Sequence, residues 1–384
     1  MIQPTRGAAA IVGVAESDLG EVPFGMTPID LMAQATHRAL EDAGLRLGDV
    51  DGVFATTSQA RLPTLALCEY LGLVPRYSDS TNVGGASFML HLRSAALAIE
   101  AGLCEVALIA HGCTQRTFGR GQAQVRDHNP FETPFKPFLP ATAYALAAAR
   151  HMHLYGTTRE QLAEVVVAAR KWAQLNPVAW DRRPLTIEDV LAAPMVSWPL
   201  SVRDCCLVTD GGGALIVTSA ARARNLRRPP VHLLGAGEAV THLAISSMTD
   251  LTVTGAAISG PQAFAAARLE PADIDIAELY DAFSINTVLF LEDLGFCPKG
   301  EGGHFVEHGR IAPGGVFPVN TNGGGLSYNH PAMYGLLLLV EAVRQLRGEC
   351  GARQAGSPEV ALVHGNGGAL SSQATVILGT AATL

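Results

Sequence analysis

The sequence is poor in charged and aromatic residues. Of its 384 residues, 16% are charged and 6% are aromatic, whereas 48% are hydrophobic. This apolar content excludes a disordered chain, because ample material is present for a buried core. The few aromatics argue against a Tyr- or Trp-rich binding surface. With a formal net charge of −8 and no basic stripe, the sequence also lacks the electrostatic signature of a nucleic-acid-binding protein.

Long apolar runs and paired cysteines are also missing. The richest apolar stretch, 336–340, is far shorter than the roughly 20 residues of a membrane-spanning helix. The run at 8–15 is too short, and too soon followed by Glu16, for a secretory signal, so we expect a cytoplasmic protein. The seven cysteines form no Cys-x-x-Cys pair and show no zinc-finger spacing. We therefore expect neither a disulfide framework nor a bound metal.

What the sequence does contain is an internal repeat. The segment 40–51 is echoed by 264–275, and Leu45 and Leu269 stand at matching positions, 224 residues apart. Each copy is typical of a helix end, a short acidic turn and a strand. The same register is kept throughout both copies.

A second echo supports the first. The segment 105–112 resembles 359–365, and each copy follows a Gly-Gly turn and an Ala- or Leu-rich helix, expected at 87–101 and 333–346. Chance similarity among Ala-, Leu- and Gly-rich helices is the alternative. Because the matched order extends over two separate segments, duplication is favoured. We predict two halves, each with a β-α-β-α-β plan.

The predicted strands are continuous apolar runs, which are typical of sheets covered by helices on both faces. They are expected at 8–14, 52–56, 106–109, 214–217, 231–234, 276–280, 361–363 and 375–378. We predict an N-terminal half over 1–225, with a loop domain at about 113–205, and a C-terminal half over 226–384. A length of 384 residues fits this division, since single cores rarely grow beyond ~250–300 residues.

Several short motifs add to this plan. They are Leu154-Tyr155-Gly156-Thr157-Thr158-Arg159-Glu160-Gln161, Leu175-Asn176-Pro177, Asp204-Cys205-Cys206 with Asp210-Gly211, His330-Pro331 and His364-Gly365. Together with the duplication, they resemble the thiolase superfamily, and within it the sterol-carrier or lipid-transfer-protein branch. The resemblance covers nearly the whole chain. It implies an α/β thiolase fold of five layers, α-β-α-β-α, with two mixed sheets, and it implies a homodimer.

The first catalytic loop departs from the thiolase pattern, in which a cysteine nucleophile starts a buried helix. The corresponding segment, 81–88, contains no cysteine. Gly84 most nearly occupies the nucleophile position, and Val83 is the alternative because the motif lengths are ambiguous. The helix start is still able to bind an oxyanion, which places Gly84 and Gly85 among the substrate-binding residues, but it cannot form an acyl-cysteine. We expect Ser87 to be a cap or packing residue, not a substitute nucleophile.

The second and third loops supply the main catalytic candidates. Tyr280 stands where the family has Asn or His, and its hydroxyl is able to donate a hydrogen bond or act as a base. A strand-end tyrosine with a surface hydroxyl is the alternative. Asp281 is expected to tie loops together beside the substrate. His330 is expected to contact an enolate oxygen, with Asn329 next to it on the substrate side. Tyr334 replaces a small residue and either fills the pocket or transfers a proton.

The fourth loop has His364 where thiolases have a cysteine acid/base. A catalytic role and a structural role, with the ring held by hydrogen bonds, both stay open for this histidine. Gly367 allows the backbone to approach the substrate closely. Pro331 is expected at the start of the helix that follows the third loop.

Loss of the cysteine disfavours ordinary acyl transfer, since no covalent intermediate is available. The sequence resembles the thiolase-like aldolases of steroid side-chain degradation, which implies retro-aldol cleavage of a β-hydroxyacyl-CoA through a thioester enolate. Tyr280, His330, Tyr334 and His364 are then the catalytic candidates, and which tyrosine is the base stays open. CoA enters as part of the substrate, and no covalently bound cofactor is expected.

The resemblance also implies a small partner subunit that carries a zinc ribbon and an OB-fold. Two other functions stay open. The first is an acyltransferase with a displaced nucleophile, for which Cys113 is the candidate, although it is better explained as a buried, inert thiol. The second is a noncatalytic acyl-CoA- or lipid-binding subunit.

Overall fold

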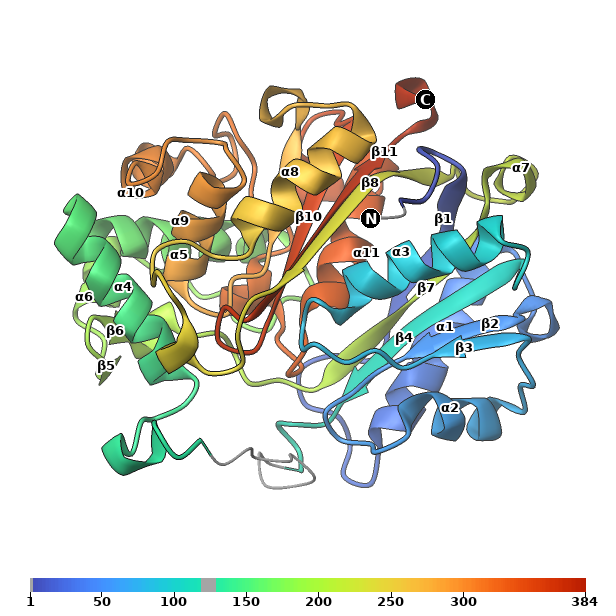
Figure 1. The fold of residues 1–384 in the computed structure, drawn as a ribbon, viewed down its shortest axis with the longest axis horizontal. Coiled ribbons are helices and arrows are strands. Elements are labelled where there is room, and N and C mark those ends of the chain that lie inside the picture. The colour runs from blue at the N-terminus through green and yellow to red at the C-terminus, as the bar shows by residue number, and fades with distance from the viewer. Residues whose placement is uncertain (1–2, 119–128) are drawn as a thin grey trace.

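The structure is a computed structural model that describes residues 3–118 and 129–384. Residues 119–128, which fall in the predicted loop domain, lie outside the described residues. Figure 1 shows strands crossing the middle of the molecule, with helices in front of them, behind them and between them. Within the described ranges, no helix is long and apolar enough to cross a membrane.

The strands of the two halves follow one repeated order. The first half contains β1 (Ala9–Glu16), β2 (Gly52–Ala55), β3 (Tyr77–Asp79), β4 (Val106–Cys113) and β7 (Gly211–Ser219), and the second contains β8 (Val231–Val240), β9 (Ile276–Leu279), β10 (Val360–Gly367) and β11 (Ser372–Gly379). In the first half the order is β3-β2-β4-β7-β1, and in the second it is β8-β11-β10-β9. β2 runs parallel to β4 as β9 does to β10, and the other repeated pairings are antiparallel. The duplicated plan is therefore confirmed.

The two predicted mixed sheets are continuous with each other. β1 pairs with β8 at only two positions, Ala10 with His232 and Ile11 with Val231. Through this short contact the described strands form one nine-stranded mixed sheet. The separate hairpin of β5 (Met195–Ser197) and β6 (Leu200–Ser201) lies in the loop domain. The predicted boundary at 225/226 falls between β7 and β8, and the division into domains stays a prediction.

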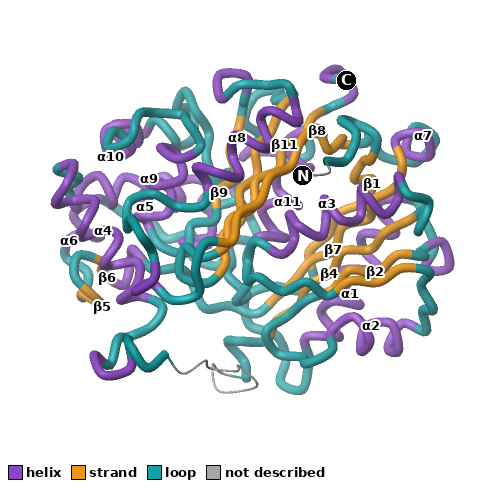
Figure 2. The backbone as a smooth tube through the Cα atoms, in the orientation of Figure 1, coloured by secondary structure: helices purple, strands orange, loops and turns teal. Residues whose placement is uncertain are grey.

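The helices build the expected layers (Figures 1 and 2). They are α1 (Pro28–Ala43), α2 (Pro63–Leu71), α3 (Ser87–Glu100), α4 (Ala141–Tyr155), α5 (Arg159–Leu175), α6 (Ile187–Leu191), α7 (Ala220–Ala223), α8 (Ala256–Ala267), α9 (Ser284–Asp293), α10 (Gly302–Val306) and α11 (Gly335–Leu346). α1 packs on β1, β4 and β7, and α8 packs on β8 and β11. α3 and α11 contact strands of both halves and each other, so they form the middle layer.

The sequence of α11 explains its central place. Residues 335–343 are all buried, including the run Leu336-Leu337-Leu338-Leu339-Val340. A helix that is apolar on every side is stable only when it is covered on every side. The short apolar run seen in the sequence is therefore the centre of the fold.

The third loop differs from the sequence prediction at the helix start. α11 begins at Gly335 with Tyr334 as its N-cap residue, so the expectation that Pro331 starts this helix is wrong. Ala332, at φ 60, adopts a left-handed conformation that interrupts any helix between the two positions. The start of α11 thus carries a tyrosine, and His330 lies on the irregular segment before it.

Candidate active site

The four predicted loops meet at the N-terminal ends of the two middle helices. The carbonyl oxygen of Gly85 lies against Gly335 at the start of α11. A Cβ atom at Gly84 would lie 2.7 Å from Cα of Gly367. The ring of Tyr280 lies against Gly85 and contacts the ring of Tyr334. The structure therefore brings together positions that are up to 283 residues apart in the sequence.

Tyr280 follows β9 and turns inward. Only 4% of the residue is exposed, so the alternative of a surface strand end is wrong. Its hydroxyl accepts a hydrogen bond from the backbone N–H of Tyr334 at 3.1 Å and donates one to the carbonyl of Ala332 at 3.4 Å. The hydroxyl therefore lies at the positive end of the α11 dipole. Burial nevertheless raises the pKa of Tyr280 well above its ordinary value, and the resting side chain is a neutral phenol.

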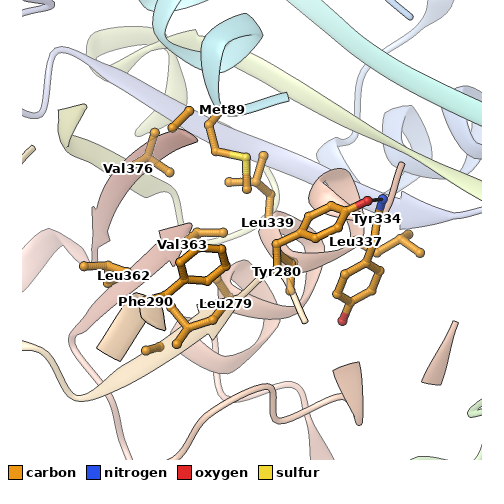
Figure 3. Packing of buried hydrophobic residues seen from close by; sticks show 14 of the residues in the cluster. Met89, Leu279, Tyr280, Phe290, Tyr334, Leu337, Leu339, Leu362, Val363 and Val376 are labelled. Atoms are coloured by element: carbon orange, nitrogen blue, oxygen red, sulfur yellow. Dashed lines mark hydrogen bonds between the residues drawn. The ribbon is translucent and has the colours of Figure 1, made fainter. Parts of the chain in front are cut away.

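Tyr334 lies beside Tyr280, but its hydroxyl points in the opposite direction (Figure 3). The two ring centroids are 5.8 Å apart, in an edge-to-face arrangement. The hydroxyl of Tyr334 donates to Oδ1 of Asn322 at 2.7 Å, and the residue is fully buried. Burial raises its pKa well above the ordinary value. The two phenols thus offer protons at two different places, one at each side of the ring pair.

His330 completes a cluster of three rings. Its centroid lies 5.6 Å from that of Tyr280 and 6.0 Å from that of Tyr334, and only 8% of the residue is exposed. The backbone N–H of His330 donates to Oγ1 of Thr209 at 2.8 Å, and Nε2 of His111 lies 2.9 Å from the carbonyl oxygen of Pro331. These contacts fix the third loop on both sides of the imidazole.

Asp281 joins the second loop to the third. Its carboxylate accepts hydrogen bonds from the backbone N–H of Gly325 at 2.6 Å and of Leu326 at 3.4 Å. Burial raises the pKa of Asp281 to about 7, although these hydrogen bonds oppose the shift. The carboxylate therefore has the linking contacts that the sequence suggested, with no substrate needed to explain them.

Asn329 is buried without protein partners. Within the described residues, neither Nδ2 nor Oδ1 of its amide has a hydrogen-bond partner, and the residue is 0% exposed. The amide lies against Gly211 at the start of β7, where a Cβ atom would come within 2.8 Å of Nδ2. A buried amide is stable only when a water molecule or a ligand satisfies it. This is an observation in favour of Asn329 as a binding residue.

Gly84 has no room for a nucleophile. Its φ of +76° is a left-handed conformation, and Gly367 and Gly368 occupy the space that a side chain would need. Ser87, in the next turn, accepts from the backbone N–H of Val83 at 2.9 Å and donates to the carbonyl of Gly84 at 2.6 Å. Both hydrogen-bonding functions of its hydroxyl are used within the turn, which confirms its packing role.

His364 lies on β10, on the face away from α3. Its Nδ1 is 2.8 Å from Oγ1 of Thr375 and its Nε2 is 2.8 Å from Oε1 of Gln373, while the ring packs edge-on against Phe290 of α9. Burial lowers the pKa of His364 to about 4. None of these contacts reaches the three-ring cluster. The catalytic role of His364 therefore stays a prediction, and Gly367 is the part of this loop that borders the site.

Sequence reasoning missed Tyr144 of α4. Its ring stacks on Phe283 at a centroid distance of 4.3 Å, and its hydroxyl donates to the carbonyl of Gly368 at 2.7 Å. The only sequence signal was a tyrosine in an Ala-rich helix of the loop domain, which by itself fits simple packing. The position of α4 over the fourth loop is a tertiary feature.

An apolar groove of about 480 Å³ lies beside the fourth loop, between α4 and the segment 245–251. Its walls include Phe131, Phe135, Leu139, Leu146, Ile245, Met248 and Leu251. Both walls are bonded to the loop: Tyr144 donates to Gly368, and Oγ of Ser371 donates to the carbonyl of Leu243 at 3.0 Å. An apolar group bound in this groove would lie next to the loop that meets Gly84.

Comparison with known proteins identifies the family. The family model described as "Thiolase C-terminal domain-like" matches residues 237–380. Over 94% of its length, the chain is 35% identical to a protein of Methanothermobacter thermautotrophicus named acetyl-CoA acetyltransferase, of which it covers 96%. The chain belongs to the thiolase superfamily.

Two further relatives place it within the superfamily. The chain is also 35% identical, over 94% of its length and 97% of the relative, to a protein of Mycobacterium tuberculosis named 17-hydroxy-3-oxo-4-pregnene-20-carboxyl-CoA lyase. A solved structure named "Ltp2-ChsH2(DUF35) aldolase" matches with a TM-score of 0.89 and 32% identity, covering 98% of this chain and 99% of that one. The predicted likeness to thiolase-like aldolases is confirmed.

None of the four loop segments 81–88, 278–284, 323–335 and 364–370 contains a cysteine. Cys113, the displaced nucleophile considered from the sequence, ends β4 and is fully buried. Burial raises the pKa of its thiol to about 12, which keeps it protonated and unreactive at neutral pH. Among the described residues, no group of three or more His, Cys, Asp and Glu side chains is placed to hold a metal ion.

Proposed function

We propose that this thiolase-superfamily protein is a carbon–carbon lyase that cleaves a β-hydroxyacyl-CoA by a retro-aldol reaction. One observation carries the proposal. Tyr280, His330 and Tyr334 form a buried cluster at the start of α11, and Gly84, the position that we assign to the thiolase nucleophile, is packed against Gly367. The site holds groups for proton transfer, and its four loops carry no cysteine for an acyl-enzyme.

In the proposed reaction, a tyrosine takes the proton of the β-hydroxyl group. The oxygen electrons form the carbonyl of the departing ketone or aldehyde, and the Cα–Cβ electron pair moves into the thioester to give an enolate. His330 donates a hydrogen bond to the enolate oxygen. A second proton from a tyrosine then reaches Cα. One proton leaves the substrate and one returns, so the reaction consumes no other reactant.

The divergent hydroxyl groups of Tyr280 and Tyr334 suit two proton transfers at different atoms. Because burial raises the pKa of each phenol, both are protonated at rest and ready to act as acids. The tyrosine that serves as the base first releases its own proton to solvent and is neutral again once it has taken the β-hydroxyl proton. The other tyrosine gives its proton to Cα and regains one from solvent, so the proton count closes. Which tyrosine is the base stays open. Gly84, Gly85, Asp281, Asn329 and Gly367 are proposed to line the substrate, with the buried amide of Asn329 as the clearest polar contact.

The substrate is proposed to be a CoA thioester with a bulky apolar acyl group. The apolar groove beside the fourth loop supports this, since Phe131, Phe135 and Leu146 line it. The name of the Mycobacterium tuberculosis relative makes a steroid side chain the first acyl group to test. CoA is part of the substrate, and we propose no bound cofactor.

We also propose that the protein is a cytoplasmic homodimer and works with a small partner subunit carrying an OB-fold and a zinc ribbon. The similar solved structure has a DUF35 unit in its name, which supports the proposal of a partner subunit. Exposed apolar side chains support protein interfaces, among them Leu65 and Tyr70 on α2 and Phe131, Phe135 and Phe138 before α4.

The experiment is turnover of a panel of β-hydroxyacyl-CoA esters, with and without the partner, scored for free ketone or aldehyde. We expect cleavage of esters with bulky acyl groups. Binding of these esters without turnover in either condition would contradict the proposal and would indicate a noncatalytic acyl-CoA-binding subunit.

Substitution of the tyrosines tests their roles. Tyr280→Phe and Tyr334→Phe keep the rings and remove the hydroxyls, so we expect kcat to fall by at least about 100-fold in each, the usual range for loss of acid–base catalysis. Tyr155→Phe, at the partly exposed tyrosine that ends α4 outside the ring cluster, is the control. Unchanged cleavage by both active-site variants would contradict the acid–base roles of Tyr280 and Tyr334.

An acyltransferase is the second candidate, favoured by the 35% identity to the acetyl-CoA acetyltransferase. This reaction needs a covalent acyl-enzyme. Incubation with acetyl-CoA followed by intact-protein mass measurement distinguishes the two: we expect no added acetyl group, and its appearance on any cysteine would favour the acyltransferase.

A further inference from the structure

A continuous chain of buried hydrogen bonds runs behind the fourth loop, from Ser259 on α8 to the backbone of Gly368. The first part joins Ser259 Oγ to Thr375 Oγ1 at 2.9 Å and Thr375 Oγ1 to His364 Nδ1 at 2.8 Å. The middle part joins His364 Nε2 to Gln373 Oε1 and Gln373 Nε2 to Asn366 Oδ1, both at 2.8 Å. The last part joins Asn366 Nδ2 to the Tyr144 hydroxyl at 2.8 Å and the Tyr144 hydroxyl to the carbonyl oxygen of Gly368 at 2.7 Å. All six side chains are buried.

The carbonyl of Gly368 fixes the direction in which each hydrogen bond of this series is donated. The carbonyl of Gly368 only accepts, so the Tyr144 hydroxyl donates to it and must accept from Nδ2 of Asn366. Oδ1 of Asn366 then accepts from Gln373, whose own oxygen faces His364. The imidazole must therefore carry its proton on Nε2 and accept from Thr375 at Nδ1. With the proton on Nδ1 instead, the amides would reverse and the Gly368 carbonyl would lose its donor.

Tyr144 is the member of the chain that touches the reacting loops. Its hydroxyl holds Gly368 in the fourth loop, and its ring stacks on Phe283 in the second loop, three residues after Tyr280. The Gly367–Gly368 turn in turn packs against Gly84. A change at Tyr144 would thus shift two catalytic loops relative to each other.

We propose that Tyr144 is a positioning residue for the lyase reaction, and that neutral His364, with its proton on Nε2, sets the direction in which the Tyr144 hydroxyl donates. The inference rests on the proposed function and deepens it. Tyr144 acts through the Gly367–Gly368 turn and the second loop, and it touches no reacting atom. His364 acts indirectly, through Gln373 and Asn366, which is the alternative to the direct catalytic role predicted from the sequence.

Burial supports the neutral form of the histidine. It lowers the pKa of His364 to about 4, so the imidazole carries one proton throughout the neutral range. Burial also raises the pKa of Tyr144 to about 12, which keeps its hydroxyl as the donor that Gly368 requires. No proton leaves this series of hydrogen bonds during the reaction.

The first test is the kinetics of Tyr144→Phe. This variant keeps the ring stack and removes the hydroxyl, so we expect kcat to fall about tenfold with KM changed less than about twofold, as for loss of one hydrogen bond that orders the site. His232→Gln is the matched control, since His232 is buried on β8, is bonded to the Gly7 carbonyl, and belongs to no part of the site. A purely structural residue would lower the unfolding temperature and leave kcat unchanged, as we expect for this control.

A double-mutant cycle tests whether the chain acts as one unit. Gln373→Leu interrupts the link between His364 and Asn366, and we expect it to lower kcat about as much as Tyr144→Phe does. In the double variant the losses should not add, because both changes break one path. Additive losses would overturn the coupling.

Nitrogen NMR of the histidines tests the tautomer directly in the wild-type protein. We expect His364, assigned by comparison with His364→Gln, to be neutral with its proton on Nε2 at pH 7. A proton on Nδ1, or on both nitrogens, would overturn the assigned direction. Lyase turnover that Tyr144→Phe leaves intact would remove the positioning role alone, whereas absence of turnover in the wild type would remove the proposed function together with it.

Discussion

At the scale of single residues, the proposed site depends on Gly84, the position predicted for the thiolase nucleophile. Gly84 combines a left-handed φ of +76° with direct packing against Gly367. A side chain at this position would have to displace the fourth loop, since the neighbours it meets are backbone atoms. The packing at Gly84 therefore leaves no room for a cysteine side chain unless the fourth loop moves.

Substitution of Gly84 tests this point. We expect Gly84→Ala to lower the free energy of unfolding by about 1–3 kcal/mol more than Gly72→Ala, because the alanine overpacks the site. Gly72 has a similar φ of +69° but nothing within 4 Å of its would-be Cβ, so its substitution measures the backbone cost alone, about 1–2 kcal/mol. Urea unfolding of both variants gives the comparison. Equal losses of unfolding free energy in the two variants would show that the fourth loop moves aside at little cost.

At the scale of secondary-structure elements, β9 and α11 are joined by a buried polar cluster next to the site. Oγ1 of Thr321 lies 2.8 Å from Oε1 of Glu278, on β9, and 2.8 Å from Oε1 of Glu341, on α11. Its single hydroxyl proton bonds to one of these two oxygens at a time. Glu341 forms a two-point ion pair with Arg353, at 2.9 Å for both contacts. Burial, with the nearby Glu341, raises the pKa of Glu278 well above its ordinary value, so Glu278 keeps its proton to a higher pH in the folded protein than in the unfolded chain.

This cluster predicts a pH dependence of stability. The folded state holds a proton on Glu278 that the unfolded state loses above pH ~4.5, so its contribution is full below that pH and falls as the pH rises. Glu278→Gln keeps the neutral form at every pH. We therefore expect the free energy of unfolding of Glu278→Gln minus that of the wild type to increase by up to about 1.4 kcal/mol per pH unit between pH 5 and the folded-state pKa of Glu278.

Urea unfolding at several pH values measures the gain, with Glu69→Gln, at an exposed glutamate of α2, as the control. A stability difference between Glu278→Gln and the wild type that does not change with pH would show that Glu278 is ionised in the fold.

At the scale of the whole molecule, the two halves depend on each other. The sheet is continuous across β1 and β8 at only two residue pairs, so backbone pairing contributes little to their union. The middle helices contribute much more. α3 from the first half packs on β10 and β11, and α11 from the second half packs on β1 and β7. Each half therefore covers the central helix of the other half.

We expect the halves not to fold alone. Expression of 1–225 or 226–384 by itself should give a chain without a cooperative unfolding transition, because the apolar surface of α3 or α11 would face water. Co-expression of the two fragments should restore near-UV circular dichroism and cooperative unfolding. A cooperative transition in either fragment alone would contradict this dependence.

Much of the fold follows from the sequence because its signals are local or repeated. The spacing of Leu45 and Leu269 predicted the duplication, and the uninterrupted apolar runs predicted buried strands. The helix after the third loop was placed too early because Ala332 adopts a left-handed conformation that its side chain does not signal. The motif around Tyr280 and His330 predicted two members of the ring cluster, and the substitution at Tyr334 predicted the third.

By itself the sequence determined the duplicated α/β fold, the loss of the nucleophilic cysteine and the family likeness, all of which are written in residue types and their spacing. Only the tertiary structure decided that the hydroxyls of Tyr280 and Tyr334 point apart, that the ring of His364 faces away from them, and that Tyr144 from the loop domain holds the fourth loop. The physical reason is that side-chain direction and hydrogen-bond partners depend on which elements pack together, and such long-range packing has no period or motif along the chain.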